Sequence, residues 1–102
     1  MTTMNIEKKL EGDTLTIALD GRLDTTTSPD LEEVLGASLD AAAALVFDFA
    51  KLDYLSSAGL RVLLSAQKRM NAKHGSMKLV HVNDAVKEVF DITGFADFLT
   101  VE

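Results

Sequence analysis

Residues 44–49 read Ala44-Leu45-Val46-Phe47-Asp48-Phe49, a short run in which apolar, β-branched and aromatic side chains follow one another with little alternation. A run of this length and composition is typical of a strand covered on at least one face. We therefore expect it to form the middle strand of a β-sheet.

On the carboxyl side, residues 52–55 are expected to form a loop, and good helix formers then continue from Ser57 to about Lys73. A helical wheel collects most of the apolar side chains on one broad arc: Leu60, Val62, Leu63, Leu64, Ala66 and Met70. The opposite arc is polar and carries Ser57, Arg61, Ser65, Lys68 and Arg69. The helix is thus predicted to pack on the core while Ser57 faces solvent.

On the amino side, alternating apolar residues predict two strands at residues 4–10 and 14–19, joined by the turn Glu11-Gly12-Asp13 into a hairpin with one buried face. A helix is expected to follow from Ser28, the predicted N-cap, to about Leu39. Pro29 then occupies the first helical position, where its fixed backbone angle is favourable.

Beyond the long helix, a strand is predicted over Met77–Val82 and a third helix over Asp84–Thr93. Asn83 is the expected cap of that helix and Gly94 its stop. A last short strand is proposed for Phe98–Val101. Strand-helix-strand units normally form right-handed crossovers onto a shared sheet. The sequence therefore predicts a single α/β domain over residues 1–102.

Composition excludes several functional classes. The net charge of −6 and the absence of a basic cluster argue against nucleic acid. No apolar run could span a bilayer, and the start of the chain lacks a signal sequence, so no membrane partner is expected. The lack of cysteine excludes thiolate chemistry and fits a reducing cytoplasm. His74 and His81 lie in different predicted elements, which argues against a metal site.

The most unusual local sequence is Asp53-Tyr54-Leu55-Ser56-Ser57-Ala58-Gly59-Leu60-Arg61, which delivers two serines to a helix start. The simple interpretation is helix capping. The alternative is a modification site, because the unpaired amides and positive dipole end of a helix favour a phosphate. A hydrolase is not expected, since the Gly-x-Ser-x-Gly elbow is missing and no motif supplies a base. Nucleotide-binding loops are also missing, so no cofactor is predicted.

Three segments of the chain together resemble the STAS family, and within it the bacterial anti-sigma-factor antagonists. Gly21-Arg22-Leu23-Asp24 is similar to the family's Gly-x-Leu/Ile-Asp element. The segment from Leu52 to Leu63 resembles its phosphorylation segment, and Val89-Phe90-Asp91-Ile92-Thr93-Gly94-Phe95 its third-helix ending. The resemblance implies a mixed β-sheet of four to five strands with helices packed mainly on one face.

Matched from Gly59 backward, the resemblance places Ser57 at the phosphoacceptor position. Ser56 replaces the usual aspartate and remains a minor alternative phosphosite, whereas Ala58 replaces a following hydroxyl residue. The resemblance also implies that a partner contacts Asp24, Ser56, Ser57 and Gly59, and the charge of Arg61 on the exposed arc beside Ser57 predicts that it joins them. The basic residues Arg61, Lys68, Arg69 and Lys73 are either a solvated helix face or a complement to an acidic partner.

The function implied by this resemblance is that of a binding protein and not of an enzyme. Unphosphorylated, it would bind an anti-sigma factor that is also its serine kinase, and so release a sigma factor. Phosphorylation of Ser57 would end the complex, and a PP2C-type phosphatase would reset it, while ATP and metal belong to the kinase. Two alternatives remain: an adaptor with a non-transcriptional output, and a module that holds a small ligand between sheet and helices.

Overall fold

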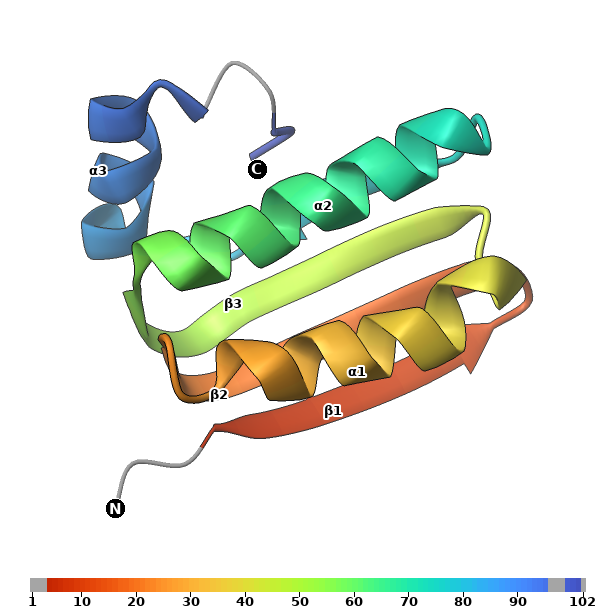
Figure 1. The fold of residues 1–102 in the computed structure, drawn as a ribbon, viewed down its shortest axis with the longest axis horizontal. Helices are drawn as coiled ribbons and strands as arrows, with labels where there is room; N and C mark the ends of the chain where they lie inside the picture. The colour runs from red at the N-terminus through yellow and green to blue at the C-terminus, as the bar shows by residue number, and fades with distance from the viewer. Residues whose placement is uncertain (1–3, 96–98, 102) are drawn as a thin grey trace.

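The computed structural model describes residues 4–95 and 99–101 and is an α/β structure built on a mixed four-stranded sheet (Figure 1). The strands lie in the order β1-β2-β3-β4. Their bounds are β1 Asn5–Glu11, β2 Thr14–Leu23, β3 Ala44–Leu55 and β4 Ser76–Val80. The helices are α1 Ser28–Ser38, α2 Ser57–Ala72 and α3 Asp84–Thr93, and a short 3-10 helix, η1 Leu39–Ala41, follows α1.

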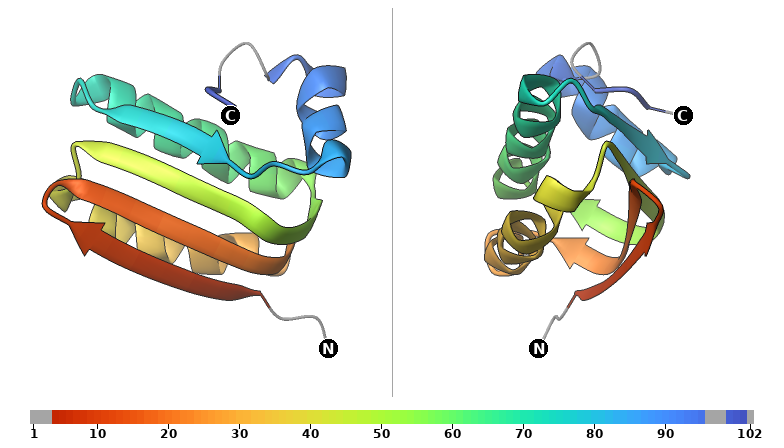
Figure 2. Two further views of the ribbon diagram at one scale, coloured as in Figure 1. Left: turned by 180° about the vertical axis from the view of Figure 1, so that it is seen from behind. Right: turned by 90° about the vertical axis from the view of Figure 1, so that its right-hand side faces the viewer.

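The sheet has one covered face and one open face. Helices α1 and α2 lie side by side on the same face, and α3 stands at one end of the sheet (Figure 2). β1 runs antiparallel to β2, whereas β2, β3 and β4 are parallel. The carboxyl ends of the three parallel strands therefore meet at one end of the molecule, where α1, α2 and α3 all begin. The predicted α/β class, the central position of β3 and the single-sided helix layer are confirmed.

The core fills the space between the sheet and the two covering helices. In β2 the odd-numbered apolar residues Leu15, Ile17 and Leu19 are buried, as the alternation predicted. On α2 the predicted apolar arc is buried as well, except Leu64, which is half-buried. The fully buried side chains with the largest volumes are Phe47, Phe49 and Phe90.

The two predicted boundaries of α3 are confirmed by the local geometry at Asn83 and Gly94. The side chain of Asn83 caps α3 by accepting the backbone N–H of Val86 at 2.9 Å. Gly94 ends the same helix in the left-handed conformation, with φ of 77°. None of the helices in the described ranges has the length and apolar character needed to cross a membrane.

The predicted loop at residues 52–55 is wrong, because β3 continues to Leu55. Leu52 and Leu55 are both buried, and their strand pairs with the end of β2 through two irregularities in the register. These irregularities explain the misleading pattern: the two leucines are three positions apart, which is not the spacing of a regular strand.

The predicted start of α1 is also wrong by one residue. Thr27 is the N-cap and Ser28 is the first helical residue. The Ser28 hydroxyl donates to the carbonyl oxygen of Asp24 at 2.5 Å, as expected for a residue already inside the first turn and not at the cap position.

The predicted strand over Phe98–Val101 lies partly outside the described residues. Within them, Val101 forms only an isolated bridge with Leu79 of β4. β4 itself ends at Val80, two residues before the predicted boundary at Val82.

Candidate functional site

Ser57 is the first residue of α2 and lies at the end of the molecule where the carboxyl ends of the parallel strands meet (Figure 1). Its side chain is exposed, as the wheel predicted. Within the described residues its hydroxyl has no hydrogen-bond partner. The hydroxyl is therefore accessible to another protein.

Ser56 has a different role from Ser57. It is the N-cap of α2, and its half-buried hydroxyl accepts the backbone N–H of Gly59 at 3.3 Å. Its own N–H donates to the carbonyl oxygen of Leu23 at 2.9 Å, which ties the start of α2 to the end of β2. The two interpretations left open by the sequence thus divide between two residues: Ser56 caps the helix and Ser57 is left exposed.

Asp24 is placed in the loop from β2 to α1, at the same end as Ser57. Its Oδ1 atom accepts the backbone N–H groups of Thr26 and Thr27, at 2.9 and 3.1 Å. The bond from Thr27 N–H is the main reason that the pKa of the Asp24 carboxyl is lowered from its usual value. Asp24 is therefore charged at neutral pH and fixes its own loop, whereas its contact with a partner stays a prediction.

Gly59 is buried in the first turn of α2, so it is not an exposed contact residue. A Cβ atom added there would lie 2.7 Å from Cγ of Leu23 and 2.8 Å from Cδ1 of Leu55. Distances this short leave no room for a side chain. Gly59 lets α2 approach the ends of β2 and β3 closely, and in this way it positions Ser57.

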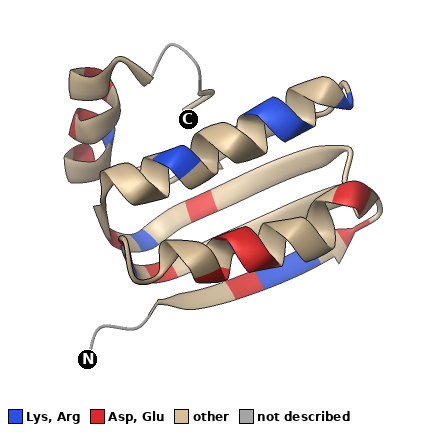
Figure 3. Ribbon diagram, viewed as in Figure 1, with Lys and Arg blue, Asp and Glu red and all other residues tan. Residues whose placement is uncertain are grey.

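The exposed side of α2 carries the predicted basic residues, and the neighbouring α1 is acidic (Figure 3). Arg61 forms no ion pair or hydrogen bond with any residue in the described ranges, and it follows Ser57 by four positions. Lys73 is different, because its Nζ atom donates to the carbonyl oxygens of Leu39 and Asp40, at 2.6 and 3.2 Å. Of the four predicted basic residues, Lys73 is therefore the one that already bonds to backbone carbonyls in the described part of the chain.

The sequence interpretation missed a pair of side chains at the same end of the molecule. The guanidinium carbon of Arg22 lies 4.2 Å from the centre of the Tyr54 ring, a cation–π contact. Arg22 Nε also lies 3.9 Å from Oδ2 of Asp24. The sequence did not predict this pair because it assigned Tyr54 to a loop. The continuation of β3 to Leu55 places Tyr54 opposite Arg22.

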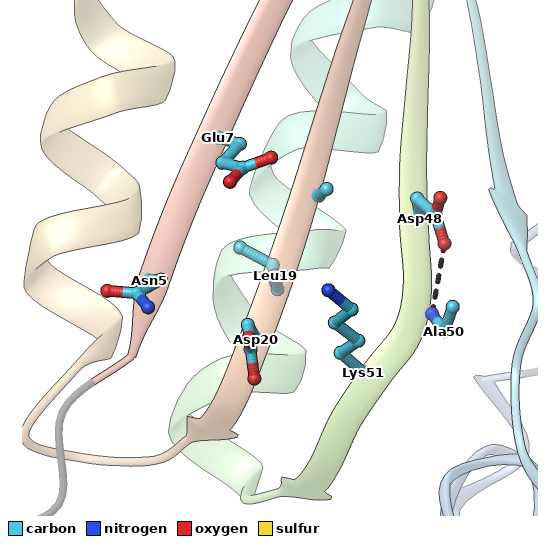
Figure 4. Close-up of a pocket in the computed structure, with 8 residues that line it drawn as sticks. Asn5, Glu7, Leu19, Asp20, Asp48, Ala50 and Lys51 are labelled. Atoms are coloured by element: carbon cyan, nitrogen blue, oxygen red, sulfur yellow. Dashed lines mark hydrogen bonds between the residues drawn. The ribbon is translucent and has the colours of Figure 1, made fainter.

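A shallow hollow of about 210 Å³ lies on the open face of the sheet, away from the helices (Figure 4). Ala18 and Ala50 lie among charged residues there, and the Asp48 carboxylate accepts the N–H of Ala50 at 3.0 Å. That bond is the main cause of the lowered pKa of Asp48, and His81 Nδ1, at 3.0 Å, is the next. The space between sheet and helices, which the alternative of a small-ligand module would require, is filled by the core.

Comparison with known proteins places this geometry among regulatory proteins. The family model of the STAS domain matches residues 5–102. BtrV of Bordetella bronchiseptica, assigned as an anti-sigma factor antagonist, is 36% identical over 94 residues, which cover 91% of this chain and 80% of BtrV. The anti-sigma-B factor antagonist of Staphylococcus epidermidis is 30% identical over 99 residues, covering 96% of this chain and 92% of that protein. These names describe a regulatory binding role and no reaction.

Solved structures show the same fold. An anti-sigma factor antagonist from Mycobacterium paratuberculosis has a TM-score of 0.87 at 23% identity, over 97% of this chain and 85% of its own. SpoIIAA in its unphosphorylated form has a TM-score of 0.82 at 20% identity, over 98% and 88%. The phosphorylated form of SpoIIAA from Bacillus has a TM-score of 0.75 at 19% identity, over 98% and 91%.

Proposed function

The chain belongs to the STAS domain family, with relatives named as anti-sigma factor antagonists, and from this premise we propose that it binds an anti-sigma factor until Ser57 is phosphorylated. The anti-sigma factor is also the serine kinase, and its capture releases a sigma factor. A PP2C-type phosphatase restores the binding form. The chain itself catalyses no step, because ATP and its divalent metal are bound by the kinase.

The observation that supports this proposal is that Ser56 and Ser57 have different structural roles. Ser56 is used to cap α2, whereas Ser57 presents an exposed hydroxyl with no partner in the described part of the chain. The start of a helix of 16 residues accepts a phosphate readily, because its dipole is positive there and, apart from the Gly59 N–H that Ser56 caps, its first amides have no partner within the helix. SpoIIAA, which shares this fold, is known in both an unphosphorylated and a phosphorylated form.

Phosphorylation opposes binding for an electrostatic reason. A phosphate adds about −1.5 to −2 charges at neutral pH and requires strong solvation. Buried in a preformed interface it would lose that solvation, and the cost exceeds what unaligned partner groups return. The modified protein therefore keeps its fold but loses its partner.

Phosphorylation of Ser57 is tested by incubating the folded protein with its cognate anti-sigma factor kinase, ATP and magnesium. Peptide mapping by mass spectrometry is expected to find one phosphate, on Ser57. Ser57→Ala should accept none, and Ser56→Ala serves as the matched control that still accepts one. Phosphate solely on Ser56, or on the threonines of residues 25–27, would overturn the site assignment.

A second expected result concerns Arg61, which lies one helical turn beyond Ser57 with no ion pair among the described residues. After phosphorylation its guanidinium turns back onto the phosphate, at the spacing where helical ion pairs form. The favourable energy is modest, about 0.5 to 1 kcal/mol, because water and salt screen an exposed pair. Losing this cation in Arg61→Gln should raise the second pKa of the phosphate.

Phosphorus NMR titration of phosphorylated wild type and Arg61→Gln measures that pKa directly. Lys68→Gln is the matched control, since it removes the same charge from the exposed side of α2 two turns further along. If the curves of wild type and Arg61→Gln coincide, Arg61 does not bind the phosphate, and the added charge alone prevents docking.

A further inference from the structure

Arg22 and Tyr54 form a stacked pair at the rim of the sheet. They are register partners on the neighbouring parallel strands β2 and β3, with the ring centre 4.2 Å from the guanidinium carbon. The next partners in the register, Leu23 and Leu55, are both buried. Since successive side chains of a strand point to opposite faces, the stack projects away from the helices.

Burial does not explain this pair. The Arg22 side chain is 44% exposed, and Tyr54 is 42% exposed. In the described part of the chain the Tyr54 hydroxyl and the terminal nitrogens of Arg22 have no hydrogen-bond partner. A large aromatic side chain is thus held in place at the surface by a cation instead of by a core.

The stack lies at the end of the sheet where α2 begins with Ser57. Tyr54 precedes Ser57 by three residues, and Ser56 N–H donates to Leu23 O, so the ends of β2 and β3 are fixed to the start of α2. Arg22 Nε also faces Asp24 Oδ2 at 3.9 Å, which links the stack to the loop before α1. A partner that covers Ser57 from the sheet side would therefore meet Tyr54 and Arg22 together.

We propose that the Arg22–Tyr54 stack is an anchor for the anti-sigma factor, which contributes an apolar pocket for the ring and a carboxylate for the guanidinium. This inference rests on the proposed function and names its contact residues. Tyrosine and arginine are the side chains that most often dominate binding energy at interfaces. A stacked guanidinium is planar, weakly hydrated and already oriented, so it pairs with a carboxylate at little entropic cost.

The test is isothermal titration calorimetry of the unphosphorylated protein with its purified anti-sigma factor. Tyr54→Ala should weaken binding by about 30-fold or more, the size typical of a central interface residue. Tyr54→Phe keeps the ring and should bind about as well as wild type. Arg22→Lys keeps the charge but loses the planar edge, so we expect a loss of about 5- to 10-fold.

Leu10→Ala is the matched control, because Leu10 is also exposed, at 50%, but lies beside the β1–β2 turn at the opposite end of the sheet. Its affinity should be unchanged. Thermal unfolding of each variant separates binding from folding, and Tyr54→Ala should keep a midpoint close to that of wild type.

Different failures are distinguishable in this experiment. If Ser57→Asp loses affinity while Tyr54→Ala binds like wild type, the stack is not an anchor, although the proposed switch stands. If the wild-type protein does not bind the anti-sigma factor at all, the proposed function fails and the anchor fails with it. The anchor is also overturned if Tyr54→Ala lowers the unfolding midpoint and its loss of binding affinity is no larger than this loss of folded protein explains.

Discussion

Ser57→Asp is expected to weaken the complex with the anti-sigma factor by about 1 to 3 kcal/mol, or roughly 5- to 150-fold in affinity. The substitution adds a permanent charge at an exposed position that the proposed interface covers. The carboxylate would lose its hydration without gaining an aligned partner. Calorimetric titration against the unphosphorylated wild type measures the difference.

Two matched variants make this result specific. Ser57→Ala removes the hydroxyl without adding charge and should bind about as well as wild type. Ser65→Asp adds the same charge to an exposed serine of α2, two turns further from the loop end, and should have a much smaller effect. Equal affinities for wild type, Ser57→Ala and Ser57→Asp would remove Ser57 from the interface.

Gly59→Ala is expected to destabilise the fold by about 1 to 3 kcal/mol, the usual cost of adding a methyl group to a fully packed site. The new Cβ would lie 2.7 Å from Leu23 Cγ and 2.8 Å from Leu55 Cδ1. Both neighbours are buried, so they cannot move aside freely. Urea denaturation monitored by circular dichroism measures the change in the free energy of unfolding.

Gly36→Ala is the control, and we expect it to change the free energy of unfolding in the opposite direction. Gly36 is an exposed residue of α1, and a Cβ atom there would have no heavy atom from outside the neighbouring helical turn within 4 Å. Alanine at such a position stabilises a helix by about 0.5 to 1 kcal/mol. If both glycines respond alike, close packing at Gly59 is not the reason for its presence.

The sequence predicts the elements with strong periodicity and misses those whose geometry depends on long-range pairing. The apolar arc of α2 and the alternation in β2 each follow one repeat, so both were predicted correctly. Leu52 and Leu55 were assigned to a loop because their spacing follows no repeat; only pairing with the irregular end of β2 makes them part of β3. The Arg22–Tyr54 stack was missed for the same reason.

At the candidate site, the sequence identified the segment but not the structural role of each residue in it. The helical wheel predicted that Ser57 faces solvent, but it did not show that Ser56 is the residue that caps the helix. The distinction is made by the backbone of Ser56, which bonds to Leu23, and by the close packing of Gly59 beneath the first turn. Likewise, only the fold brings Lys73 to the end of α1.

The position of Ser57 inside a capped helical turn also determines how a kinase could recognise it. A kinase that threads its substrate as an extended peptide would first have to break the Ser56 cap and lift Gly59 from the leucines beneath it. The kinase proposed for Ser57 is therefore expected to recognise the folded surface, so that a linear consensus around this serine carries little of the specificity. The replacement of the family's usual aspartate by Ser56 is then compatible with the proposed phosphorylation, because the kinase would recognise the folded shape of the domain.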